Sequence, residues 1–174
     1  HFREPGYPEL YLFPGRQIIT KERIEILALT VDLEIEDGLP AQEVVDLILR
    51  NEGLPVVSWA PGKWFFKRRK VVAALLAANK PGSLLLGDTT LRPMGWGTPL
   101  LMRKGIGKGF GVVSGSDPLP FEGEEQVLGR YGVSIDCDFD LQNPAKSIRS
   151  IFRNPGFRPT LVGNRGNIVQ TLGR

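Results

Sequence analysis

Histidine is almost absent from this 174-residue chain, whose single histidine, His1, stands at the first position. Cysteine is equally scarce. Cys137 is the only one, so it cannot form a disulfide within the chain, and this is typical of a reducing compartment. We therefore expect a cytoplasmic protein. Zinc sites take most of their ligands from histidine and cysteine, so tight zinc binding is not expected here.

Long apolar runs are also lacking. No stretch approaches the roughly 20 apolar residues that a membrane-spanning helix needs, and we expect no membrane partner. The apolar share of 41% and the charged share of 24% are typical of a soluble globular domain. The formal net charge is +3, and cations gather at 63–70 and 103–108. Such clusters favour an anionic partner, but a solvated helix face has the same composition.

Short apolar runs alternate with amphipathic ones along the chain. Strands are expected at 25–33, 54–59, 83–88, 109–116 and 133–138. Helices are expected at 40–51, 66–80, 98–105, 123–132 and 143–154. Strands separated by helices indicate βαβ units. The predicted fold class is therefore α/β, with parallel strands alternating with helices in one domain over residues 1–174 and an irregular tail at 155–174.

Candidate functional residues follow the predicted strands. In parallel α/β folds, functional groups gather where the strands end. These positions hold Trp59, Lys63, Trp64, Asp88, Arg92 and Asp117. We expect them to share one cleft, although loops are also polar for other reasons. Asp117 is the best placed, because it follows the predicted strand 109–116 directly.

The stretch "SWAPGKWFFKRR" (58–69) contains a Gly-Lys pair between two tryptophans. It is not a phosphate-binding P-loop, because Gly62-Lys63 is followed by Trp64 rather than by serine or threonine. Lys63 can still meet a phosphate as a point charge. Trp59 and Trp64 would either stack on a ligand ring or close the hydrophobic core.

Four segments share a further pattern in this order: "FPGRQIIT" (13–20), "RIEILALTV" (23–31), "GLPVVSWAP" (53–61) and "GVVSGSDPLP" (111–120). Together they resemble the PHP superfamily of metal-dependent phosphoesterases, which is named for polymerases and histidinol phosphatases. The resemblance implies an incomplete distorted (β/α)7 barrel that lacks its amino-terminal strands. This sequence departs from the family at its metal ligands: Gln17 replaces a glutamate and Glu25 a histidine, and only Asp117 matches a ligand position.

Three functions follow as hypotheses. The first is a divergent PHP-like hydrolase acting on a phosphorylated substrate. In it, Glu25, Asp88 and Asp117 would bind magnesium or manganese rather than zinc, with Asp88 and Asp117 as the catalytic residues. The metal would generate the attacking hydroxide, and Lys63, Arg92, Trp59 and Trp64 would bind the substrate.

The second hypothesis is a non-catalytic PHP-like module that binds an anionic small molecule or a protein partner. Because the family's histidines are absent, the sequence does not clearly favour the first hypothesis over this one. The third, nucleic-acid binding, rests only on charge and aromatic residues and is the weakest of the three.

Overall fold

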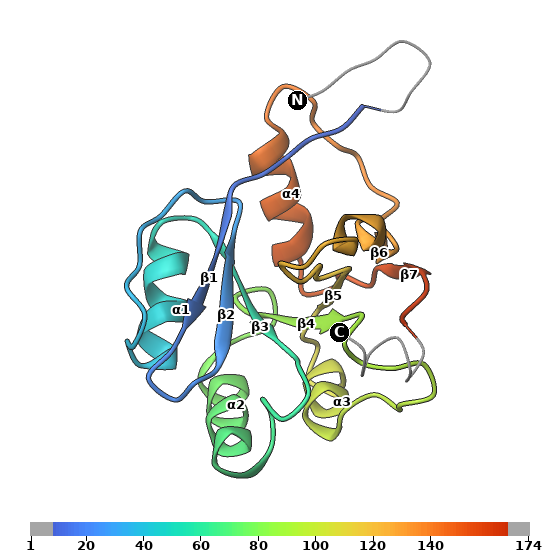
Figure 1. Ribbon diagram of the computed structural model, residues 1–174. Coiled ribbons are helices and arrows are strands. Elements are labelled where there is room, and N and C mark those ends of the chain that lie inside the picture. Colours follow the sequence, from blue (N-terminus) through green and yellow to red (C-terminus); the bar gives the residue numbers. More distant parts are fainter. Residues whose placement is uncertain (1–8, 167–174) are drawn as a thin grey trace.

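A computed structural model describes residues 9–166 of the chain (Figure 1). The main sheet contains β1 (Gly15–Ile19), β2 (Glu25–Leu29), β3 (Leu54–Ser58), β4 (Leu85–Thr89) and β5 (Val112–Gly115). The α-helices of this region are α1 (Ala41–Arg50), α2 (Phe66–Ala78), α3 (Leu100–Gly107) and α4 (Pro144–Arg153). A small second sheet pairs β6 (Tyr131–Ser134) with β7 (Thr160–Gly163). No helix in residues 9–166 is long and apolar enough to cross a membrane.

The parallel half of the main sheet is built as the sequence predicts. The strands lie in the order β1-β2-β3-β4-β5, and β4 is parallel to both β3 and β5. Helices α2 and α3 connect these three strands. Consequently β3, β4 and β5 all end at the same side of the sheet, which we call the carboxyl edge. The loops 59–65 and 90–99 leave the sheet at this edge.

The antiparallel half corrects the prediction of a parallel sheet. Strands β1 and β2 are antiparallel, because only residues 20–24 join them and a parallel crossover needs a dozen residues or more. Strand β3 is also antiparallel to β2. Before α1 begins, an extended segment already carries the chain back along the sheet, and there Gly38 donates its backbone N–H to the carbonyl of Ile19. Helix α1 then returns to the end of the sheet where β2 stopped.

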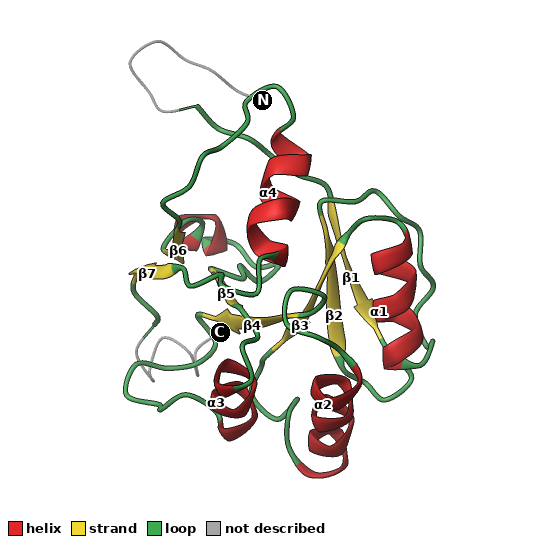
Figure 2. Ribbon diagram, turned by 180° about the vertical axis from the view of Figure 1, so that it is seen from behind, coloured by secondary structure: helices red, strands yellow, loops and turns green. Residues whose placement is uncertain are grey.

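Alternate side chains of the strands enter two separate hydrophobic cores. Val57 and Leu86 pack with α1, α2 and α3 on one face, whereas Val56 and Leu85 pack with Phe157 and the apolar side of α4 on the other. Figure 2 shows α4 on the opposite side of the sheet from α2 and α3. Helix α3 lies close to β4, since a Cβ atom on Gly105 would come within 2.6 Å of Leu86. This close packing holds the last turn of α3 against β4.

Four further predictions need adjustment. The sheet is open, so the described residues do not form a closed barrel. The stretch 123–132 contains only a 3-10 turn, Glu124–Val127, and the strand expected at 133–138 begins two residues earlier, at Tyr131. The tail is not wholly irregular, because β7 lies within it. Its last part, 167–174, falls outside the described residues.

Candidate ligand-binding site

The loop after β3 places two tryptophans beside each other at the carboxyl edge. Trp59 follows the strand directly, is only 2% exposed and donates its backbone N–H to Gly87 on β4. The chain then turns at Gly62, whose φ of +75° favours glycine. Trp64 is 4% exposed, and its indole Nε1 donates to the carbonyl of Ser58 at 3.0 Å. The turn therefore closes back on the end of its own strand.

The loop after β4 brings the third tryptophan to the same place. Trp96 is 46% exposed, although tryptophan is a strongly apolar residue. Its position is held through the main chain, since its carbonyl accepts a hydrogen bond from Arg92 Nη1 at 2.7 Å. Arg165, near the end of the described chain, reaches the same carbonyl at 3.4 Å. The main chain at Trp96 is thus held by two guanidinium groups, while the indole ring stays half-exposed.

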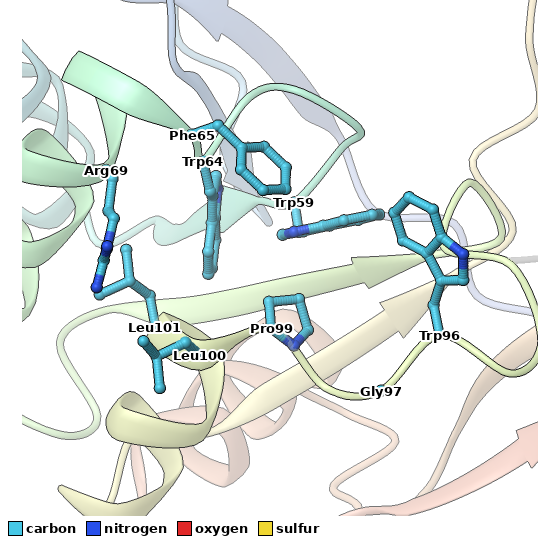
Figure 3. Close-up of a pocket in the computed structure, with 9 residues that line it drawn as sticks. All are labelled: Trp59, Trp64, Phe65, Arg69, Trp96, Gly97, Pro99, Leu100 and Leu101. Atoms are coloured by element: carbon cyan, nitrogen blue, oxygen red, sulfur yellow. The ribbon is translucent and has the colours of Figure 1, made fainter.

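These two loops and the helices that follow them enclose a cavity of about 320 Å³. We call it the tryptophan pocket; it is lined by Trp59, Trp64, Phe65, Arg69, Trp96, Gly97, Pro99, Leu100 and Leu101. Figure 3 shows the rings of the three tryptophans and Phe65 around a common space, with Pro99 and the two leucines opposite Phe65. The chain has only three tryptophans, so every one of them lines this pocket.

Charge in the tryptophan pocket comes from one lining residue, Arg69, in the first turn of α2. Lys63, on the same loop as Trp64, pairs instead with Glu25 of β2. Lys63 was expected to meet a phosphate as a point charge, and in the structure its ammonium has a carboxylate partner instead. The buried Trp64 ring packs in the hydrophobic core, one of the two roles expected for it, and also lines the pocket.

A second feature of the carboxyl edge is a buried ionic cluster, formed by Asp88, Arg92 and Tyr131. Arg92 holds the Asp88 carboxylate with two bonds, Nε to Oδ1 at 2.7 Å and Nη2 to Oδ2 at 2.5 Å. The Tyr131 hydroxyl donates to Oδ2 at 2.9 Å. Asp88 is 2% exposed and Arg92 is 5% exposed. The cluster joins β4 of the main sheet to β6 of the small one.

The ionisation of this cluster follows from its surroundings. Burial alone would lower the pKa of Arg92, but the hydrogen bond and the charge of Asp88 raise that pKa, and the net pKa lies above its ordinary value. Burial also raises the pKa of the Tyr131 hydroxyl, and the neighbouring Asp88 charge contributes to the rise. Arg92 is therefore cationic and Tyr131 protonated at neutral pH, the states in which both donate to Asp88.

The end of β5 lies next to this cluster. Thr90 donates its hydroxyl to the carbonyl of Ser116 at 2.5 Å, which ties the loops after β4 and β5 together. Asp117 follows with a φ of +49°, a conformation that aspartate and asparagine tolerate better than most residues. Asp88 lies on β4, and Asp117 lies two residues after the end of the neighbouring parallel strand β5.

The candidate residues do not all line one cleft. Trp59 and Trp64 line the tryptophan pocket, whereas Asp88 and Arg92 line a separate cavity of about 210 Å³ between α3 and the segment 157–161. Lys63 pairs with Glu25, and neither of these two residues lines either cavity. The prediction of a single cleft is therefore corrected. Arg92 links the two cavities, because it lines one and holds the Trp96 carbonyl beside the other.

Two of the three carboxylates predicted to bind a divalent metal, Asp88 and Glu25, are engaged by side chains of the protein. Asp88 is occupied by Arg92 and Tyr131, and Glu25 by Lys63. Within residues 9–166, no three histidine, cysteine, aspartate or glutamate side chains are grouped so that they could hold a metal ion. The magnesium or manganese site at Glu25, Asp88 and Asp117 stays a prediction.

Sequence reasoning missed three contributors: Trp96, Arg69 and Tyr131. Trp96 was detectable, since it lies in the loop after a predicted strand and is the only other tryptophan. Arg69 is one of several neighbouring cations, and nothing in the sequence marks it as the one that faces the pocket. Tyr131 is 43 residues away from Asp88 along the chain, and only the tertiary structure brings the two together.

Comparison with known proteins assigns no relative. A scan against protein-family models finds no matching family, and a search of curated proteins finds no match to this chain.

Proposed function

We propose that this chain is a binding module that takes a small organic ligand with a flat ring into the tryptophan pocket. One observation carries the proposal: two separate loops bring every tryptophan of the chain to one cavity of about 320 Å³ at the carboxyl edge. Ligand pockets of proteins are largely apolar and aromatic, contain few polar groups, and lie at strand ends in α/β sheets.

The exposure of the lining residues supports a binding role over a structural one. Phe65, Trp96 and Leu100 are each between 44% and 46% exposed at this site, although burial would stabilise the fold. Neighbouring exposed apolar side chains are characteristic of binding surfaces. The pocket therefore combines a buried, rigid part, Trp59 and Trp64, with an accessible part that a ligand can cover.

This proposal corresponds to the second function predicted from the sequence, a non-catalytic module. The PHP-like ancestry and the incomplete barrel are part of the same proposal. Three parallel strands with helices between them are compatible with part of such a barrel, and the site lies at the edge where that fold would place it.

The experiment uses the three tryptophans as reporters. In a ¹H–¹⁵N correlation spectrum, all three indole N–H signals belong to pocket residues, so 2-naphthylmethanol should shift them in a saturable way. Trp96→Ala should weaken this binding at least tenfold and leave the melting temperature nearly unchanged. Met94→Ala is the matched control, because Met94 is exposed to a similar extent on the same loop but does not line the pocket. Equal affinity in Trp96→Ala and Met94→Ala would refute the proposal.

Phosphoester hydrolysis is the second candidate, supported by the position of Asp88 and Asp117 on neighbouring strand ends. It predicts hydrolysis of p-nitrophenyl phosphate that depends on added Mn²⁺ and is lost in Asp117→Asn. Asparagine tolerates the backbone conformation of Asp117, so this variant should fold. Activity that persists in Asp117→Asn, or that needs no metal, would exclude this candidate.

A further inference from the structure

We infer that the ligand of the tryptophan pocket is an aromatic anion: a flat ring system that bears a carboxylate or phosphate group, with Arg69 as its counter-charge. This inference rests on the proposed binding function and specifies the chemical class of the ligand. It follows from the size of the cavity and from the sign of the charge around it.

The cavity has room for a small ring system. An apolar cavity of about 150 Å³ is enough to bind benzene, so a cavity of about 320 Å³ accommodates about two fused rings. The rings of Trp59, Trp64, Trp96 and Phe65 provide several aromatic faces and edges around it. Aromatic pairs in stacked or edge-to-face contact gain about 0.5–1.5 kcal/mol beyond the burial of their area. A flat aromatic ligand uses this lining better than an aliphatic one.

Aromatic lining by itself does not determine the charge of the ligand. Cages of tryptophan and phenylalanine also bind cations such as quaternary ammonium groups, because the ring faces are negative. Such cages attract a cation best when no positive side chain competes. In the tryptophan pocket, Arg69 is the only charged lining residue, and none of the lining residues is acidic. A bound cation would therefore be repelled.

The two loops that form the pocket strengthen this positive field. Residues 59–70 and 90–99 contain no aspartate or glutamate, but they contain six cations: Lys63, Lys67, Arg68, Arg69, Lys70 and Arg92. Two of the six are neutralised, Lys63 by Glu25 and Arg92 by Asp88. Within residues 9–166 the remaining four form no ion pair. Their shared field favours an anion at the pocket and steers it there.

The position of Arg69 in α2 also favours an anionic ligand. It lies in the first turn of α2, which contains no acidic residue, and a cation there opposes the helix dipole. An anion bound by Arg69 would relieve this conflict. The guanidinium group also matches the two oxygens of a carboxylate or the oxygens of a phosphate with paired hydrogen bonds. Ring and anionic group can thus be bound by different parts of the same pocket.

The test compares three probes with the same ring and different charge: 2-naphthoate, 2-naphthylmethanol and 2-naphthyltrimethylammonium. Their dissociation constants are measured from the indole N–H signals of the wild-type chain. We expect the anion to bind at least tenfold more tightly than the alcohol, and the cation to bind most weakly. Raising the salt concentration should narrow the difference between anion and alcohol, because the charges around the site are exposed.

A pair of variants assigns the effect to Arg69. Arg69→Gln should reduce the affinity for 2-naphthoate to that of the alcohol and leave the affinity for the alcohol unchanged. Arg68→Gln is the matched control, because Arg68 does not line the pocket and its guanidinium lies near the carbonyl of Arg23. We expect it to keep most of the preference for the anion.

The outcomes separate this inference from the function on which it rests. If the cation binds as tightly as the anion, or if Arg69→Gln leaves the preference unchanged, the inferred ligand class is wrong while the pocket still binds a ring. If none of the three probes shifts any indole signal up to its solubility limit, the proposed binding function itself fails. An anion preference that Arg69→Gln removes and Arg68→Gln keeps supports both.

Discussion

The tryptophan pocket and the ionic cluster lie at the same edge of the sheet, but they differ in whether their side chains find their partners within the protein. In the ionic cluster, Asp88, Arg92 and Tyr131 are buried and bind one another. In the tryptophan pocket, large apolar rings border a cavity, and the lining charge, Arg69, is exposed. A group whose partners lie within the protein stabilises the fold, whereas a half-exposed ring and an exposed charge can be satisfied by a ligand.

This contrast changes how the charged strand-end residues are interpreted. From the sequence, Asp88 and Arg92 are as suitable for metal and substrate as any residue near a strand end. In the structure they belong to the ionic cluster, where they bind each other and stabilise the fold. The proposed binding site, the tryptophan pocket, is formed mainly by apolar residues, which sequence reasoning would otherwise assign to the core.

The largest expected effect is on the ionic cluster. Arg92→Met leaves the buried Asp88 carboxylate without its cation, so the free energy of unfolding should fall by about 3–5 kcal/mol. Urea unfolding measures this loss. The double variant Asp88→Leu/Arg92→Met removes both charges and should recover much of it. A loss below about 1 kcal/mol for Arg92→Met would show that the pair behaves like an exposed surface pair.

The next largest effect is the difference in stability between replacing a buried and a half-exposed tryptophan. Trp64→Ala removes a buried ring and a hydrogen bond, so it should lower the free energy of unfolding by about 3–5 kcal/mol. Trp96→Ala removes a half-exposed ring and should cost about 1 kcal/mol or less. Urea unfolding of both variants tests this difference. Equal losses would mean that Trp96 is as much a part of the core as Trp64.

A smaller effect, with a distinct pH dependence, is expected at Tyr131. Tyr131→Phe removes a hydrogen bond to a carboxylate, which contributes about 1.5–3 kcal/mol. Because burial raises the pKa of the folded-state Tyr131 above the unfolded value of about 10, the native state keeps this proton where the unfolded state has lost it. The stability that this group contributes is fully present below the unfolded-state pKa of about 10. It is lost as the pH rises through the folded-state pKa.

Urea unfolding measured at increasing alkaline pH tests whether stability falls as predicted. The wild-type chain should lose stability above about pH 10 more steeply than Tyr131→Phe does. Tyr11→Phe is the control, because the Tyr11 hydroxyl bonds the exposed Glu9. The same alkaline slope in wild type and Tyr131→Phe would argue against a buried, raised Tyr131.

The smallest effect is expected for the second ion pair at this edge, Lys63–Glu25. Its side chains are 30% and 16% exposed, respectively, so solvent weakens the attraction. Lys63→Met should lower the free energy of unfolding by no more than about 1 kcal/mol, and this small loss should shrink further in high salt. A loss as large as that of Arg92→Met would place this pair in the same class as the ionic cluster.

Much of the fold follows from local sequence patterns. The apolar periodicity of 40–51 and 66–80 predicts α1 and α2 within two residues at each end, and the runs near 54–59 and 83–88 predict β3 and β4. These elements form where predicted because their apolar spacing matches the period of a helix or a buried strand. The direction of β2 relative to β3 was harder to predict, because it depends on the path of the segment before α1.

The candidate site was predicted only in part, for a related reason. The sequence places Trp59 and Trp64 after a strand, and it places Asp88 and Arg92 after the next one. It does not show which residue forms an ion pair or a hydrogen bond with each of these side chains. Glu25 is 38 residues from Lys63 and Tyr131 is 43 residues from Asp88 along the chain, so their pairing depends on long-range packing rather than on spacing.

The sequence by itself determined the α/β class, the parallel strands with helices between them, and the shortage of zinc ligands. These features depend on composition and on periodicity along the chain. Only the tertiary structure decided that the charged strand-end residues are buried partners of one another and that three tryptophans meet around one cavity. The physical reason is that burial and pairing depend on residues distant in sequence, which folding brings together at one edge of the sheet.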